Sequence, residues 1–288
     1  MARLDPFRSS RARDDFIAQY DAVMGNWPVP FEDRASSTSF GMTHMIVSGP
    51  PDAQPLVLFH GANTTAAMWV PVIERLSASY RCYCIDTITD ANKSVVTRRL
   101  RGVEDHIVWM REVFAALDIQ SARVAGLSYG GWLATVLSVH APELVERLVL
   151  LCPAGTFTRL TTEFMVRMIG SSAMRSPALA RRSIQWLSST PDAPSDEVLC
   201  LVARILIECR PTMMPPTALS DDELRRIDVP TTVVVGDREV IYRGGPQAAL
   251  DRARRLIPDV RTRLVRGGHV LTVDCPKELA DEVLAALT

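Results

Sequence analysis

The sequence carries no excess of either charge. Its 32 lysines and arginines are balanced by 33 aspartates and glutamates, which gives a formal net charge of −1. Nucleic-acid-binding domains usually concentrate basic residues, and no apolar run here is long enough to cross a bilayer. We therefore expect neither a nucleic-acid nor a membrane partner. The first residues do not form a secretory signal peptide, so we expect a cytoplasmic protein.

Motifs that bind metals or phosphates are also missing. The six cysteines include no C-x-x-C pair, and the sequence has no H-E-x-x-H, so we expect no metal site. Cys82 and Cys84 alternate along an apolar stretch, as small buried side chains do. The glycine pairs Gly244-Gly245 and Gly267-Gly268 are too short to cradle a phosphate. No cofactor is expected.

What the sequence does contain is an alternation of apolar runs and helical stretches. Buried strands are expected at residues 55–59, 80–85, 122–127, 148–152, 231–235 and 261–265. Two more are expected near 35–40 and 43–47, with a turn at Gly41. Helical spacing of apolar residues fills most of the intervals between the buried strands. This alternation predicts an α/β fold with a mostly parallel central sheet flanked by helices.

The alternation is interrupted between residues 155 and 228. Helical stretches punctuated by prolines replace the strands there. We therefore divide the chain into a first core segment, 1–154, with an N-terminal helix at 9–25, a helical cap at 155–228 and a second core segment at 229–288. Bulky apolar residues of the cap, such as Phe164 and Trp186, are candidates to line a pocket.

Gly126-x-Ser128-x-Gly130 lies where the predicted strand 122–127 turns abruptly into a helix. Such a turn strains its corner residue and leaves the Ser128 hydroxyl exposed to a reacting group. The helix N-terminus adds unpaired N–H groups and partial positive charge. A G-x-S-x-G match alone is a weak signal, but the preceding strand and the following helix make Ser128 a candidate nucleophile.

A serine hydroxyl needs a base to become a good nucleophile. Among the five histidines, His269 is the candidate, because it follows Gly267-Gly268 directly after the last predicted strand. An imidazole can take and return a proton near neutral pH. The others are expected to have packing or surface roles: His44, His60, His106 and His140.

Over residues 35–288 the chain resembles the α/β-hydrolase fold family. The resemblance rests on Leu58-Phe59-His60-Gly61, Gly126-x-Ser128-x-Gly130, Gly236-Asp237-Arg238-Glu239 and Gly267-Gly268-His269. Three further segments look like a bacterial carboxylesterase-like branch of that family: Trp27–Pro30, Gly41–His44 and Asp90–Ser94.

The resemblance implies a third catalytic residue, an acid that orients the imidazole. In this family it follows the strand before the last one, and the pattern G-x-x-D places it at Glu239, where aspartate is usual. Asp237 is the alternative acid. Some relatives carry the acid after the preceding strand instead, but here that loop, 152–155, has no carboxylate.

The resemblance also implies an oxyanion hole made of the backbone N–H groups of Ala62 and Tyr129. Asn63 could replace or support Ala62. For His60 we expect only a bracing role in this loop.

The implied activity is hydrolysis of a carboxylic ester of a mostly apolar small molecule, through an acyl-enzyme on Ser128 and without a cofactor. A thioesterase, a lactonase or a carbon–carbon bond hydrolase would use the same residues. A slow-turnover ligand sensor that signals to a partner is the alternative from another class. The sequence is compatible with a monomer and with a homo-oligomer.

Overall fold

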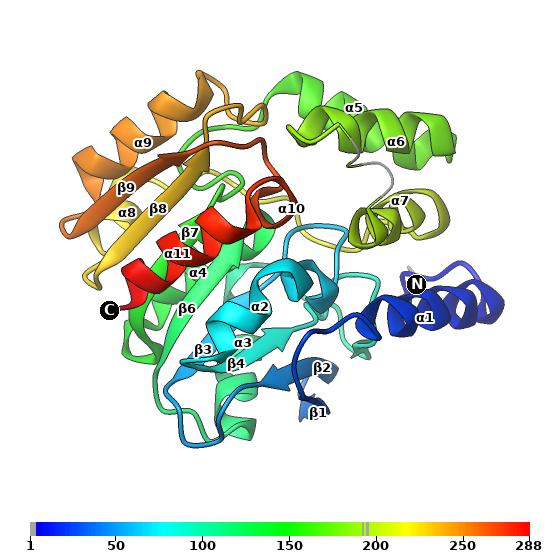
Figure 1. Cartoon of the computed structure of the whole chain (residues 1–288), viewed down its shortest axis with the longest axis horizontal. Coiled ribbons are helices and arrows are strands. Elements are labelled where there is room, and N and C mark those ends of the chain that lie inside the picture. Colours follow the sequence, from blue (N-terminus) through cyan, green and yellow to red (C-terminus); the bar gives the residue numbers. More distant parts are fainter. Residues whose placement is uncertain (1–3, 192, 194–195) are drawn as a thin grey trace.

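Nine strands form one sheet in the computed structural model, which describes residues 4–191, 193 and 196–288 (Figure 1). The strands are β1 (Phe31–Thr38), β2 (Gly41–Ser48), β3 (Pro55–Phe59), β4 (Arg81–Ile85), β5 (Val95–Val96), β6 (Ala122–Leu127), β7 (Val145–Leu151), β8 (Thr231–Gly236) and β9 (Val260–Val265). Their order is β1-β2-β4-β3-β6-β7-β8-β9, and β5 pairs with β2.

Most of the sheet is parallel. Strand β2 pairs antiparallel with β1, β4 and β5, and every pair from β4 across to β9 is parallel. The central strands are buried on both faces, and in β8 all six residues are buried. This is why they are mostly apolar and do not alternate regularly with polar residues. The expected α/β fold is therefore confirmed.

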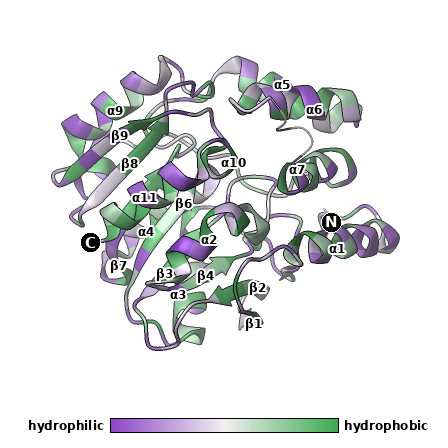
Figure 2. Cartoon of the chain, viewed as in Figure 1, coloured by the Kyte–Doolittle hydropathy of each residue, from purple (hydrophilic) through white to green (hydrophobic). Residues whose placement is uncertain are grey.

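The helices cover both faces of the sheet. They are α1 (Ser10–Met24), α2 (Val70–Ser77), α3 (Val103–Ala116), α4 (Tyr129–His140), α5 (Thr162–Met174), α6 (Pro177–Leu187), α7 (Glu197–Glu208), α8 (Asp221–Arg225), α9 (Gly245–Leu256), α10 (Leu271–Asp274) and α11 (Pro276–Leu287). Helices α2 and α11 lie in front of the sheet in Figure 1, with α3 and α4 behind it. Figure 2 shows the apolar residues concentrated in the strands between them.

The first hairpin differs from its predicted boundaries. Strand β1 begins at Phe31 and not near residue 35, and the turn is Ser39-Phe40, so Gly41 belongs to β2. The reason is the position of β1 at the edge of the sheet. Its first five residues are exposed, so their sequence carries no apolar strand signal.

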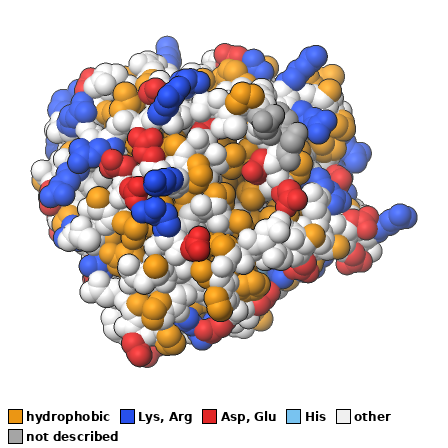
Figure 3. Space-filling model, viewed as in Figure 1, with side chains coloured by type: hydrophobic (Ala, Val, Ile, Leu, Met, Phe, Trp, Pro, Cys, Tyr) orange, Lys and Arg blue, Asp and Glu red, His pale blue; other side chains and the backbone are white. Residues whose placement is uncertain are grey.

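Helices α5, α6 and α7 follow β7 and precede β8 in the chain, and they pack against one another. Helix α8 packs against α9 instead. In Figure 1 the first three lie together at one end of the sheet. None of the helices in the described ranges is long and apolar enough to span a membrane. On the face drawn in Figure 3, acidic and basic side chains are interspersed, in keeping with the balanced charge of the chain.

Candidate active site

Ser128 occupies the corner between β6 and α4 in a rare backbone conformation. Its φ is 55° and its ψ is −114°, values that cost a non-glycine residue free energy unless its surroundings enforce them. Three hydrogen bonds do so. The Ser128 N–H donates to the Leu151 carbonyl at 2.8 Å, and the Ser128 carbonyl accepts from Trp132 N–H at 3.1 Å and Ala154 N–H at 2.9 Å.

The glycines on either side of this corner are required by close backbone contacts. A Cβ atom on Gly126 would lie 2.1 Å from the Gly130 carbonyl oxygen, and one on Gly130 would lie 2.1 Å from the Phe59 carbonyl oxygen. Neither position has room for any side chain. The motif therefore lets α4 begin directly against the carboxyl ends of β3 and β6, with Ser128 at the corner between β6 and α4.

Ser128, His269 and Glu239 lie in hydrogen-bond contact. The distance from Ser128 Oγ to His269 Nε2 is 2.9 Å, and that from His269 Nδ1 to Glu239 Oε2 is 2.8 Å. All three residues are buried. Because an ionised carboxylate can only accept, Nδ1 must donate to Glu239, which leaves Nε2 of a neutral ring to accept the serine proton.

Glu239 is buried, yet its surroundings favour the ionised carboxylate. Burial by itself would raise the pKa of Glu239, but attraction to His269 and hydrogen bonds from His269 and the backbone outweigh this and lower it. Its Oε1 accepts the N–H groups of Val240 at 2.8 Å and Ile241 at 3.0 Å. The carboxylate is thus fixed by its own backbone while Oε2 faces the imidazole.

Asp237 lies elsewhere. Its side chain is exposed and accepts the Gly267 N–H at 3.0 Å. That bond braces the turn after β8 against the loop after β9. The structure therefore brings Glu239 to the imidazole and assigns Asp237 a contact with the backbone.

The loop that carries His269 is tied down by a residue that sequence reasoning missed. Asp274 accepts the Gly268 N–H at 2.6 Å and the Ser189 N–H at 3.1 Å, and the His269 N–H donates to the Leu187 carbonyl at 2.7 Å. These bonds join the loop after β9 to the end of α6. Nothing in the sequence near Asp274 distinguishes it from a helix-terminal carboxylate.

Cys152 lies beside Glu239 and His269, and each of the three side chains offers one atom that could bind a metal ion. Within the described part of the chain, this is the group of three such side chains that could hold a metal ion. Burial is the main cause that raises the pKa of the Cys152 thiol, and the Glu239 charge adds to it. A protonated thiol is a poor metal ligand, and the other two residues already bind each other, so we assign no metal to them.

The loop after β3 brings a second backbone segment to Ser128. A Cβ atom on Gly61 would lie 3.4 Å from Ser128 Cβ. The Gly61 carbonyl oxygen accepts hydrogen bonds from His60 Nδ1 at 2.7 Å and Thr64 Oγ1 at 2.9 Å. In a planar trans peptide the N–H points opposite to the C=O, so these bonds also fix the direction of the Ala62 N–H.

Ala62 and Tyr129 have N–H groups that no acceptor among the described residues occupies. The Asn63 N–H, in contrast, donates to Asp90 Oδ2 at 2.8 Å, which leaves Ala62 as the available donor of its loop. His60 is fully buried, accepts the Thr87 N–H at 3.0 Å through Nε2, and has a pKa lowered mainly by burial. Its contacts are those of a brace.

The remaining histidines lie away from the Ser128 hydroxyl. His44 bonds through Nδ1 to Asp86 at 2.7 Å. His106 bonds to the Gly102 carbonyl at 2.7 Å and to the Tyr129 hydroxyl at 3.3 Å. His140 lies exposed at the end of α4.

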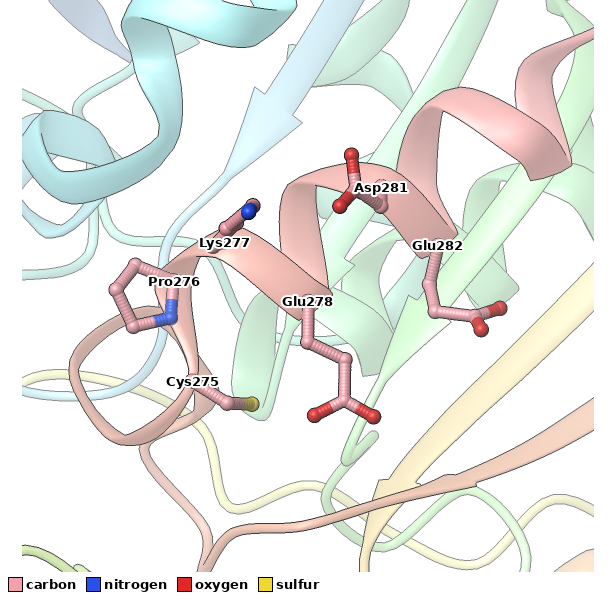
Figure 4. A pocket seen from close by; sticks show the side chains of 6 residues that line it. All are labelled: Cys275, Pro276, Lys277, Glu278, Asp281 and Glu282. Atoms are coloured by element: carbon pink, nitrogen blue, oxygen red, sulfur yellow. The ribbon is translucent and has the colours of Figure 1, made fainter.

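A mostly apolar hollow opens over Ser128 and His269. Helices α5, α6 and α7 each contribute to its lining: Phe164, Met168, Ile184, Leu187, Leu199 and Val202. Trp186, the other cap candidate, does not line it and instead packs under the Arg167 guanidinium. A more open hollow lies on the outside of α11 (Figure 4), where Asp281 and Glu282 already pair with Arg75 and Arg263. Ser128 and His269 both line the first hollow.

The chain is similar to known proteins over most of its length. The model of the alpha/beta hydrolase family matches residues 56–282. The carboxylesterase YbfK of Bacillus subtilis is 33% identical over 282 residues, which cover 94% of this chain and 93% of the relative. The uncharacterized carboxylesterase nap of the same organism is 32% identical over 277 residues, covering 93% and 91% of the two chains.

Solved structures give the same result. The crystal structure of carboxylesterase CesB (YbfK) from Bacillus subtilis superposes with a TM-score of 0.87 at 32% identity, covering 96% of this chain and 98% of that one. The naproxen esterase from the same organism also gives 0.87, at 29% identity and with coverage of 96% and 99%.

Proposed function

Because the chain belongs to the alpha/beta hydrolase family, we propose that it hydrolyses carboxylic esters with Ser128 as nucleophile, His269 as base and Glu239 as the acid that orients the base. The observation that carries the assignment of roles is the continuous hydrogen-bonded line from Ser128 Oγ through both nitrogens of His269 to Glu239. Side chains in this arrangement can remove a proton from the serine and hold the resulting positive charge.

The reaction begins when Ser128 Oγ attacks the ester carbonyl carbon and its proton passes to His269 Nε2. The tetrahedral intermediate collapses as the C–O bond to the alcohol breaks, and the imidazolium protonates the departing oxygen. The acyl group now forms an ester with Ser128. A water molecule then gives a proton to His269 and attacks this ester, and the acid is released with Ser128 reprotonated.

Negative charge develops on the carbonyl oxygen in both tetrahedral intermediates. The N–H groups of Ala62 and Tyr129 are the donors we assign to it, and the second lies at the N-terminus of α4, where the helix dipole adds positive potential. Donors of this kind stabilise the transition state more than the neutral substrate, so they raise kcat.

The substrate class follows from the lining of the hollow. Apolar side chains surround the reactive serine, which favours small-molecule esters whose acyl or alcohol part is mostly apolar. The names of the two relatives, a carboxylesterase and a naproxen esterase, are consistent with such substrates.

The buried thiols of Cys82 and Cys84 suit a reducing compartment, and we propose a cytoplasmic location.

A panel of p-nitrophenyl esters, thioesters and lactones tests the activity. Hydrolysis of p-nitrophenyl esters well above the rates for thioesters and lactones is expected. Preference for either of the other classes would reassign the substrate while keeping the roles of the residues. Turnover slower than one event per several minutes on every substrate would favour a ligand sensor instead.

Glu239→Gln is expected to lower kcat for a p-nitrophenyl ester by on the order of 10⁴, because a neutral amide does not offset the imidazolium charge and its NH₂ group can hold the imidazole in the wrong tautomer. Asp237→Asn should keep substantial activity, since the Asp237 side chain accepts the Gly267 N–H, whereas Glu239 is the carboxylate bonded to His269. Steady-state kinetics of the two variants check this. If Asp237→Asn were the inactive variant and Glu239→Gln the active one, Glu239 would not be the orienting acid.

We also propose that residues 155–228 act as a cap that selects substrates. Its helices α5, α6 and α7 line the hollow, whereas the three residues assigned to the chemistry come from outside it. Phe164→Ala enlarges the hollow and is expected to shift the kcat/KM ratio of octanoyl to acetyl ester by about tenfold, since one methylene contributes about 1–3 kcal/mol of discrimination. Trp186→Ala is the matched control and should leave the ratio within about twofold. Equal ratios in wild type and Phe164→Ala would contradict the proposal.

A further inference from the structure

The loop that bears Ala62 is held by its neighbour in the sheet. Strands β3 and β4 pair in parallel, with Phe59 opposite Ile85, so the loops that follow them meet at one edge. Three hydrogen bonds join these loops. Thr87 N–H donates to His60 Nε2 at 3.0 Å, Ala66 N–H to Asp86 Oδ1 at 2.7 Å, and Asn63 N–H to Asp90 Oδ2 at 2.8 Å.

Asp90 is the member of this set that bonds to Asn63, the residue directly after the proposed oxyanion donor Ala62. It is 5% exposed, and among the described residues no basic side chain pairs with it. Its two oxygens are used by backbone N–H groups, Oδ2 by Asn63 and Oδ1 by Ala91 at 3.1 Å. Burial raises the pKa of Asp90 to about 7, and these two N–H groups oppose the rise.

Asn63 needs this support because of its backbone. Its φ is 55°, in the left-handed region that a residue with a side chain occupies at a cost. The hydrogen bond from its N–H to Asp90 Oδ2 offsets that cost, and it is stronger while Asp90 is ionised. Since Ala62 precedes Asn63 directly, fixing the Ala62–Asn63 peptide from one side and the Gly61 carbonyl from the other determines where the Ala62 N–H points.

We propose that Asp90 is a positioning residue of the oxyanion hole: by accepting the Asn63 N–H, its carboxylate holds the loop so that the Ala62 N–H faces the oxygen of the tetrahedral intermediate. The proposal rests on the proposed ester hydrolysis and adds a residue to it. Asp90 makes no contact with substrate. Asp90 acts on the orientation of the Ala62 N–H through the peptide that joins Ala62 to Asn63.

A residue that acts in this way affects the transition state more than substrate binding. The ground-state carbonyl oxygen is neutral and interacts weakly with a displaced donor, whereas the oxyanion depends strongly on it. Loss of the Asp90 contact should therefore lower kcat with little change in KM. A purely structural role in shaping the hollow would instead raise KM or lower the amount of folded protein.

The test compares Asp90→Ala, which removes both acceptor oxygens, and Asp90→Ser with wild type on p-nitrophenyl acetate. We expect kcat to fall about tenfold and KM to stay within about twofold, because a misplaced donor forfeits part of the 10²–10³ that such a donor supplies. A trifluoromethyl ketone, which adds to the serine and forms a tetrahedral oxyanion, should lose about tenfold in affinity. The product acid, acetate, should inhibit all three proteins alike.

Asp105→Asn is the control, because Asp105 also accepts a backbone N–H, that of Arg101 at 2.8 Å, away from Ser128. It should behave as wild type. Thermal unfolding identifies a variant that does not fold, and Asp90→Ser, whose hydroxyl oxygen lies one bond short of the Oδ2 position, then carries the test. Wild-type kcat and ketone affinity in either folded Asp90 variant would overturn the proposal, as would a change in KM alone. Failure of the proposed function would show separately, as wild type that neither hydrolyses esters nor is labelled at Ser128.

Discussion

Replacing Ser128 with alanine is expected to lower kcat for p-nitrophenyl esters by on the order of 10⁶, since the covalent route is lost and only binding and the oxyanion donors remain. Thermal unfolding should stay close to that of wild type, because alanine keeps the Cβ atom and the three backbone hydrogen bonds at this corner. Stopped-assay kinetics and calorimetry on the same preparation measure both.

Labelling identifies the acylated residue directly. An organophosphonate ester probe should modify wild type at Ser128 alone and leave Ser128→Ala unmodified. Ser128→Gly is an informative companion, because glycine adopts a φ of 55° without strain. It should be as inactive as the alanine variant but unfold at a higher temperature. Labelling that persists in Ser128→Ala would place the nucleophile elsewhere.

His269→Ala is expected to lower kcat by on the order of 10⁶, because His269 Nε2 is the base that hydrogen-bonds to the Ser128 hydroxyl among the described residues. It should also abolish rapid labelling by the phosphonate probe, since the probe needs an activated serine. KM should change little, because the imidazole acts on the serine and the leaving group. Steady-state kinetics and labelling rates measure these effects.

His106→Ala is the matched control. Its ring bonds to the Tyr129 hydroxyl and not to the Tyr129 N–H, so most of the activity should remain. Similar losses in the two variants would show that the loop after β9 does not supply the base.

The sheet was predictable because its strands are buried on both faces. Continuous apolar runs such as those of β3, β6 and β8 can only be accommodated between two layers of helices, and the sequence shows them directly. Strand β1 was misplaced because an exposed edge strand is stabilised by backbone pairing with β2, which leaves no apolar pattern.

The candidate site divides in the same way. Ser128, His269 and Glu239 were found from local patterns and chain order, and the structure brings their side chains together. Asp90 and Asp274 were not assigned a role, because each acts on a loop distant in sequence from its own and no local pattern reports such a contact. Trp186 and Phe164 looked equivalent as bulky cap residues, and only the packing of α5 against α6 separates them.

The separation of the reactive side chains along the chain has a consequence for biosynthesis. Ser128 precedes His269 by 141 residues. At a translation rate of about 5–20 residues per second, the nucleophile is made roughly 7 to 28 s before its base. During that interval the nascent polypeptide contains a serine with no partner to activate it. With these two residues in their proposed roles, ester cleavage begins only after the last strand has joined the sheet, and an incomplete chain cannot consume the substrate.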